Sequence, residues 1–197
     1  PISTPKIRVK SVKASKFSNS IDLGQKSYLT PDECLILVWE PKEIAKQLTL
    51  LDSKLFRKID IYEMVLKRWN ENAYSEQCPN AITYIKRFNS VSFWVQYLIL
   101  NQQSEDQRCN LIQKFLEIAL YCLEFQNYNS AHSIYSALVR LHDLGIWSSI
   151  LSTDQNYISL WEVFCRENLT QDLDKLYRNL DCSAVPSIPY FTKAFFQ

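Results

Sequence analysis

The residue types that most often carry enzyme chemistry are few and scattered in this chain. The histidines are His132 and His142. The cysteines form no CxxC pair; they are Cys34, Cys78, Cys109, Cys122, Cys165 and Cys182. Zinc sites and disulfide frameworks need closely spaced ligands or paired cysteines, so neither is predicted. We interpret the thiols as reduced cysteines in or near a helical core.

Paired carboxylates are the other usual sign of catalysis. Glu117 with Glu124, or Asp172 with Asp174, could in principle act as a general acid and base. The helical pattern around them gives each a solvated or capping role, because no cleft is indicated that would shift their pKa values. A Ser-His-Asp triad is not expected either, since both histidines fall within one predicted helix.

Glycine is nearly absent, and this limits both function and fold. The chain contains only Gly24 and Gly145. Glycine-rich phosphate-binding loops and the GxSxG nucleophile turn are therefore excluded. Tight β-hairpin turns also need positive φ, which favours glycine, so β-rich folds are disfavoured. The predicted fold class is all-α, a single multi-helix domain.

Composition and charge narrow the range of partners. Apolar residues make up 47% of the chain, and 22 basic residues nearly balance 21 acidic ones, which argues against a nucleic-acid partner. No apolar run approaches the roughly 20 residues that cross a bilayer, and PISTPKIRVK has no signal-peptide core. We expect a cytoplasmic protein, recruited to membranes without inserting. Residues 1–40 are interpreted as an N-terminal arm or linker, and residues 41–197 as the helical domain.

The helical signals become regular from Pro41, which suits the first position of a helix. One face then carries Ile44, Ala45, Leu48 and Leu51. Asp52-Ser53 is interpreted as a fresh N-cap, followed by a second short helix.

Further helices are predicted along the rest of the chain. Pro79-Asn80 opens a long helix, and Ser104 to Phe125 carries two apolar stripes, as expected for a helix in the middle of a bundle. Residues 127–130 break the pattern, and the next helix is predicted over Ala131 to Leu144. Two more are expected before Pro186.

Four blocks of sequence occur together in this helical frame. They are PKEIAKQLTLLDSKLFRKIDIYEMVLKRW at 41–69, PNAITYIKRFNSVSFWV at 79–95, FQNYNS at 125–130 and SIPYF at 187–191. In this order and near this spacing they resemble the catalytic domain of Ras-family guanine-nucleotide exchange factors, as in Son of sevenless. The match covers roughly residues 40–140 and 176–196.

The resemblance implies a binding function without covalent chemistry. Such a domain binds a Ras-superfamily small GTPase, prefers its nucleotide-free form, promotes release of Mg²⁺ and GDP, and needs no cofactor of its own. The family grips switch II of the GTPase in a bowl of side chains. The positions of this chain that match the bowl are Trp69, Ile85, Lys86, Phe88, Asn89, His132, Val139, Tyr177 and Tyr190. Ile85, Phe88 and Tyr190 would supply apolar anchors.

The chain also departs from the family pattern. Val139 stands where a polar contact is common, Thr192 stands where glycine is usual, and Lys86 and Phe88 replace more typical residues. These changes leave the choice of GTPase open. The hairpin that displaces switch I in the family would follow Gln197, so no catalytic hairpin residue is assigned and the domain is expected to be C-terminally incomplete.

Two alternatives stay open beside the exchange factor. One is a GTPase-binding scaffold without exchange activity, and the other is a helical adaptor without a GTPase partner. The glycine-poor, Asn- and Lys-rich composition is typical of AT-rich genomes. It suits either a protist regulator or a bacterial effector that acts in the host cytosol.

Overall fold

The chain divides into two compact units, Pro1–Val38 and Trp39–Gln197, seen here in a computed structural model. The structure describes residues 36, 38–66, 76–146, 162 and 184–187. In the first unit only Ile36 and Val38 are described, both with helical backbone. The fold below concerns the second unit.

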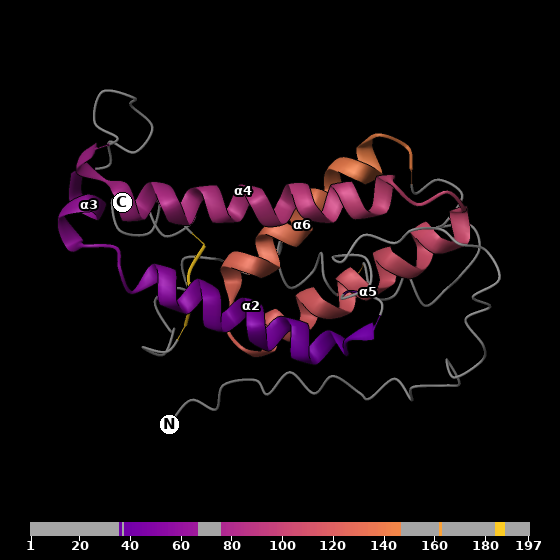
Figure 1. The fold of residues 1–197 in the computed structure, drawn as a ribbon, viewed down its shortest axis with the longest axis horizontal. Coiled ribbons are helices and arrows are strands. Elements are labelled where there is room, and N and C mark those ends of the chain that lie inside the picture. The colour runs from indigo at the N-terminus through magenta and orange to yellow at the C-terminus, as the bar shows by residue number, and fades with distance from the viewer. Residues whose placement is uncertain (1–35, 37, 67–75, 147–161, 163–183, 188–197) are drawn as a thin grey trace. The chain divides into compact units, whose positions relative to one another are not determined.

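Five helices make up the described part of the second unit (Figure 1). They are α2 (Pro41–Phe56), α3 (Ile61–Leu66), α4 (Pro79–Leu100), α5 (Glu105–Glu124) and α6 (Tyr128–Asp143). The described residues contain no strand; their one extended contact is an isolated parallel bridge between Asn127 and Val185. The predicted all-α class is confirmed, and none of the described helices is both long and apolar enough to span a membrane.

Local sequence explains where most of these helices begin. Pro41 and Pro79 occupy the first turns of α2 and α4, where a missing N–H costs no helical hydrogen bond. Ser104 begins α5 with a capping box, because its hydroxyl accepts from Gln107 N while the Gln107 side chain accepts from Ser104 N. Asn127 caps α6 by accepting from Ser130 N.

The helices pack as two connected pairs. α4 packs against α6 and crosses it, α2 packs against α5, and contacts between α5 and α6 and between α2 and α4 join the pairs (Figure 1). Both predicted stripes of α5 are buried, which confirms its central position. Its fully buried members include Ile112, Phe115, Leu116, Ile118 and Ala119.

Three local predictions are wrong. Asp52-Ser53 does not begin a helix, because α2 runs without a break to Phe56. The helix predicted from Ala131 begins at Tyr128, since Asn127 and not a later residue supplies the cap. Leu51, predicted to face the core, is 50% exposed. The two helices expected between residues 147 and 183 lie outside the described residues.

Candidate functional site

Four of the predicted binding residues lie within two turns of α4. Lys86 and Asn89 are exposed, whereas Ile85 and Phe88 are half-buried. Phe88 lies four residues after buried Tyr84, so both fall on the side of the helix that faces the core. Lys86 and Asn89 therefore form the accessible part of this group, and Phe88 also contributes to packing.

Two further predicted residues lie on α6, the helix that packs against α4. His132 is buried, with 5% exposure, and its ring lies 6.4 Å from the ring of Tyr128 between centroids. Val139 is half-buried and lies seven residues further on, which places it on the same face of the helix. The remaining predicted residues, Trp69, Tyr177 and Tyr190, lie outside the described residues.

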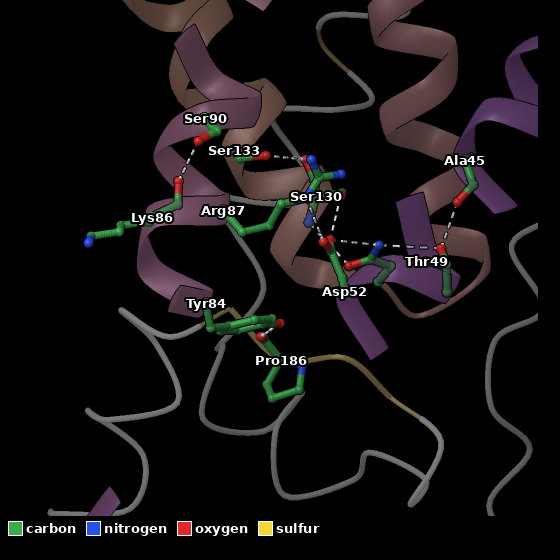
Figure 2. A network of polar contacts seen from close by, with 11 residues as sticks. Ala45, Thr49, Asp52, Tyr84, Lys86, Arg87, Ser90, Ser130, Ser133 and Pro186 are labelled. Carbon is green, nitrogen blue, oxygen red and sulfur yellow. Dashed lines mark hydrogen bonds and ion pairs between the residues drawn. The ribbon is translucent and has the colours of Figure 1, made fainter. Parts of the chain in front are cut away.

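A buried carboxylate connects the helices that carry these residues (Figure 2). Asp52 of α2 is fully buried and accepts three hydrogen bonds. Ser130 Oγ donates to its Oδ2 over 2.5 Å, Asn127 Nδ2 to the same oxygen over 3.2 Å, and Arg87 Nε to Oδ1 over 3.3 Å. The residue predicted to start a new helix instead joins α2 to α4 and to the beginning of α6.

Adjacent residues of α4 point in different directions (Figure 2). The side chain of Arg87 extends into the network, while that of Lys86 points away from it. The Arg87 side chain is 26% exposed and forms an ion pair with Asp52, whose side chain has no exposed surface. The ion pair of Arg87 with Asp52 fixes which side of α4 faces the core, and Lys86 consequently points outward.

The turn between α5 and α6 is the second half of this network. Asn127 accepts from Ser130 N through Oδ1 and donates through Nδ2 to Asp52 and to Thr49 Oγ1. The residue before it, Gln126, has a φ of 56°, a left-handed conformation that side chains other than asparagine rarely adopt. The FQNYNS block that carries the family resemblance thus forms a turn and a helix cap.

A short segment near the C-terminus is fastened to this turn and to α4. Val185 N donates to Gln126 O, and Tyr128 N donates to Val185 O, both over 2.9 Å. The hydroxyl of buried Tyr84 donates to Pro186 O over 2.9 Å (Figure 2). Residues 185–187 are buried, so the segment that leads into the SIPYF block is held against the core.

Glu63 performs a similar task at the first turn of α4. Its side chain is almost fully buried, with 5% exposure of the residue. Oε2 accepts from Ala81 N over 2.8 Å and Oε1 accepts from Asn80 Nδ2 over 2.7 Å. A carboxylate at a helix N-terminus satisfies unpaired N–H groups and interacts favourably with the helix dipole. α3 therefore caps α4 from outside.

The sequence contained a signal for Asp52 that the cap interpretation missed. Asp52 lies four residues after Leu48 and seven after Ala45, on the buried face of α2. A carboxylate on an apolar stripe indicates buried partners, because an unpaired buried charge is very costly. Glu63 gave no such signal, because α3 has only six residues, too few for their spacing to reveal a buried face.

Titratable groups gather where α2 packs against α5. Burial raises the pKa of Glu117 above its ordinary value, and Glu40 adds to this, while a hydrogen bond from Gln113 and the charge of Lys114 oppose it. Burial lowers the pKa of Lys114, against the attraction of Glu40 and Glu117. Glu117, expected to have a solvated or capping role, is thus half-buried in the structure.

The thiols and metal-ligand residues give no second candidate site in the part of the chain that is described. Cys78 and Cys122 have buried side chains and Cys109 has a half-buried one, as predicted for thiols in or near a helical core. Burial, with a smaller effect of Asp52, raises the pKa of the Cys122 thiol. No group of three or more His, Cys, Asp or Glu side chains among these residues is placed to hold a metal ion.

Known proteins are similar to this chain in sequence. Ras guanine nucleotide exchange factor R of Dictyostelium discoideum is 31% identical over 167 residues, which are 85% of this chain and 9% of that protein. The mouse Ras-specific guanine nucleotide-releasing factor RalGPS1 is 31% identical over 177 residues, 87% of this chain and 29% of that protein. Human Rap guanine nucleotide exchange factor 1 is 41% identical over 96 residues, 49% of this chain and 9% of that protein.

The chain therefore spans less than a third of each of these relatives, all of them eukaryotic, and they lend no support to a bacterial effector. The family model described as the RasGEF domain matches residues 43–197. That range contains every described helix from α3 onward and nearly all of α2. The capped α4, the FQNYNS turn and the family match agree, and the chain belongs to the RasGEF domain family.

Proposed function

We propose that the helical unit from Pro41 onward is the part of a guanine-nucleotide exchange factor that grips switch II of a Ras-like GTPase. The observation that carries the proposal is the family match over residues 43–197, on a chain whose α4 exposes Lys86 and Asn89 on a rigidly held helix. Relatives whose names specify Ras or Rap exchange support this class of partner.

The proposed mechanism needs only binding energy. An exchange factor that binds the nucleotide-free GTPase more tightly than the GDP-bound form shifts the equilibrium toward release of GDP. Lys86 would face acidic residues of switch II, Asn89 would hydrogen-bond its backbone, and Ile85 would contribute apolar contact area. No covalent bond is made or broken, and the chain supplies no cofactor.

The network below α4 supports this role physically. A surface that must hold a GTPase without its nucleotide pays less entropy if its helices are already ordered. Glu63 caps α4 at its first turn, and Arg87, between Lys86 and Phe88 on the same helix, donates a hydrogen bond to buried Asp52. We infer that these two carboxylates position the binding face without touching the partner.

The decisive experiment measures release of fluorescent GDP from a panel of Ras, Rap, Ral and Rab-like GTPases. The chain is tested beside a form of the protein extended beyond Gln197, and binding to each nucleotide-free GTPase is measured in parallel. Faster release with either form supports the exchange factor. Binding without faster release supports the scaffold alternative, and neither binding nor release with any GTPase contradicts both.

A further inference from the structure

A second surface combines exposed apolar side chains with cations at the corner between α2 and α3. We call it the basic corner, and it consists of Leu50, Lys54, Arg57, Lys58, Ile61 and Tyr62. Leu50 and Ile61 are each 65% exposed and Tyr62 is 75% exposed. Lys54, Arg57 and Lys58 are also exposed.

Helix geometry puts the α2 members of the basic corner on one face. Leu50 and Lys54 are four residues apart on α2, and Arg57, the C-cap residue with helical backbone angles, follows three residues later. The three side chains are therefore neighbours on the outside of the helix end. The opposite face carries buried Ala45, Leu48 and Asp52. The outward direction of Leu50 and the cations is thus set by the buried contacts of the same helix.

The α3 members are turned outward for a comparable reason. Buried Glu63 ties α3 to the first turn of α4 through Ala81 N and Asn80 Nδ2. The two residues before it, Ile61 and Tyr62, begin the helix on the exposed side, where Asp60 Oδ1 accepts from Tyr62 N. Apolar side chains are therefore presented to solvent by a helix that is itself anchored.

The charge of this surface is strongly biased in a chain that is nearly neutral overall. Between Ile44 and Tyr62 the basic residues are Lys46, Lys54, Arg57 and Lys58, against the acidic residues Asp52 and Asp60. Asp52 is buried and bonded to Arg87, and Lys46 pairs with Glu43. Among the exposed side chains of this stretch, the positive charges of Lys54, Arg57 and Lys58 are therefore opposed by the single negative charge of Asp60.

We propose that the basic corner docks the protein onto an anionic lipid surface. Lysine and arginine would contact lipid phosphates, while Leu50, Ile61 and Tyr62 would enter the boundary between headgroups and acyl chains. A protein partner fits less well, because the buried centre of a protein interface is depleted in lysine and here cations separate the apolar side chains. The proposal does not depend on the exchange function.

The test is co-sedimentation of the chain with vesicles of phosphatidylcholine alone or mixed with phosphatidylserine, without any GTPase. We expect binding to the mixed vesicles only, weakening as salt is raised. Neutralising Lys54, Arg57 and Lys58 together to glutamine should lower the partition coefficient roughly fivefold per charge, on the order of 100-fold in all. Leu50→Ser with Tyr62→Ser should lower it roughly tenfold.

Two controls separate the basic corner from other surfaces. Phe93→Ser with Tyr97→Ser removes comparable apolar side chains from α4, which are 60% and 52% exposed, and should leave vesicle binding unchanged. Neutralising Lys6, Lys10 and Lys13 tests the basic N-terminal arm and should leave most of the binding. All variants should keep the circular dichroism of the parent, because the substituted helical residues are exposed.

Three results would overturn the proposal. They are no binding to phosphatidylserine vesicles, unchanged binding after the three cations are neutralised, and loss of binding only when the arm is neutralised. If the first of these results came with binding of the chain to polyglutamate, the surface would be assigned to an acidic protein segment.

Discussion

Arg87 of α4 donates from Nε to Oδ1 of Asp52 in α2 across 3.3 Å, although 35 positions separate them in the sequence. The Asp52 carboxylate also accepts from Ser130 and Asn127 at the beginning of α6. This one side chain therefore receives donors from two other parts of the fold. Its hydrogen bonds join α2 to α4 and α6, the two helices that carry the described predicted binding residues.

Removal of the Asp52 carboxylate should be severely destabilising. Asp52→Ala leaves buried donors of Asn127 and Ser130, and a largely buried Arg87 cation, without their acceptor. The free energy of unfolding should fall by about 3–5 kcal/mol, measured by urea denaturation. Asp143→Ala, at a side chain that is 72% exposed, should change it by less than about 0.5 kcal/mol. A loss below about 1 kcal/mol for Asp52→Ala would show that the network contributes little.

Glu63 should stabilise the first turn of α4, because it accepts hydrogen bonds from two donors there. Glu63→Ala removes the acceptor of Ala81 N and Asn80 Nδ2, so we expect a loss of about 1.5–3 kcal/mol, as for hydrogen bonds to charged groups. Glu63→Gln keeps an amide oxygen and should lose less. Hydrogen exchange of the first turn of α4 should rise in Glu63→Ala and stay low in Glu124→Ala, an exposed control. Equal protection in both variants would contradict the capping role.

The positive φ of Gln126 predicts a stabilising substitution. Glycine adopts φ near 56° without the steric cost that other residues meet there. Gln126→Gly should raise the free energy of unfolding by up to about 1 kcal/mol, after the greater freedom of the unfolded chain is subtracted. Gly145→Ala provides the opposite case, because Gly145 has a φ of 77°, and it should destabilise although nothing lies within 4 Å of the added Cβ. Thermal denaturation of both variants tests the pair, and a lower Tm for Gln126→Gly would reject the explanation.

Glu117 should make stability depend on pH in a direction that can be worked out. Burial raises the pKa of Glu117 in the folded protein above the ordinary value of 4.5, so the folded state holds its proton more tightly than the unfolded state. The contribution of Glu117 to stability is therefore greatest at low pH and declines as pH rises through the folded pKa. Glu117→Gln removes this decline. The free energy of unfolding of the variant minus that of the parent should therefore be larger at neutral pH than below pH 4.5. Urea denaturation measures both free energies of unfolding. If their difference stays constant from below pH 4.5 to neutral pH, Glu117 does not cause the expected pH dependence.

The proposed binding face predicts different behaviour for two neighbouring residues. Lys86 is exposed, so Lys86→Glu should slow association with the GTPase on the order of tenfold without changing stability. Phe88 is half-buried on the core side of α4, so Phe88→Asp should weaken both folding and binding. Exchange assays and urea denaturation are read together, with Lys46→Glu on α2 as the matched charge control. If Lys46→Glu and Lys86→Glu slow exchange equally, the effect is one of net charge and not of the α4 face.

Local sequence was sufficient for much of the fold. The helices that begin at Pro41 and Pro79 were predicted from the proline positions, and the helix from Ser104 was predicted from its apolar stripes, because both signals act within a few turns. The central place of α5 followed from its two apolar stripes. The family itself was predicted from motif order, and the match over residues 43–197 confirms it.

The roles of the polar motif residues were decided by tertiary structure. Asp52 has the sequence context of an N-cap, yet its partners are 35, 75 and 78 positions away. Glu63 caps a helix to which it does not belong, and Tyr84 reaches Pro186 over 102 positions. A cap or a stripe is a property of neighbouring residues, whereas a buried hydrogen bond depends on which segments folding brings together. The sequence by itself thus determined the helices and the family, and the packing of α2, α4 and α6 decided which side chains hold them in register.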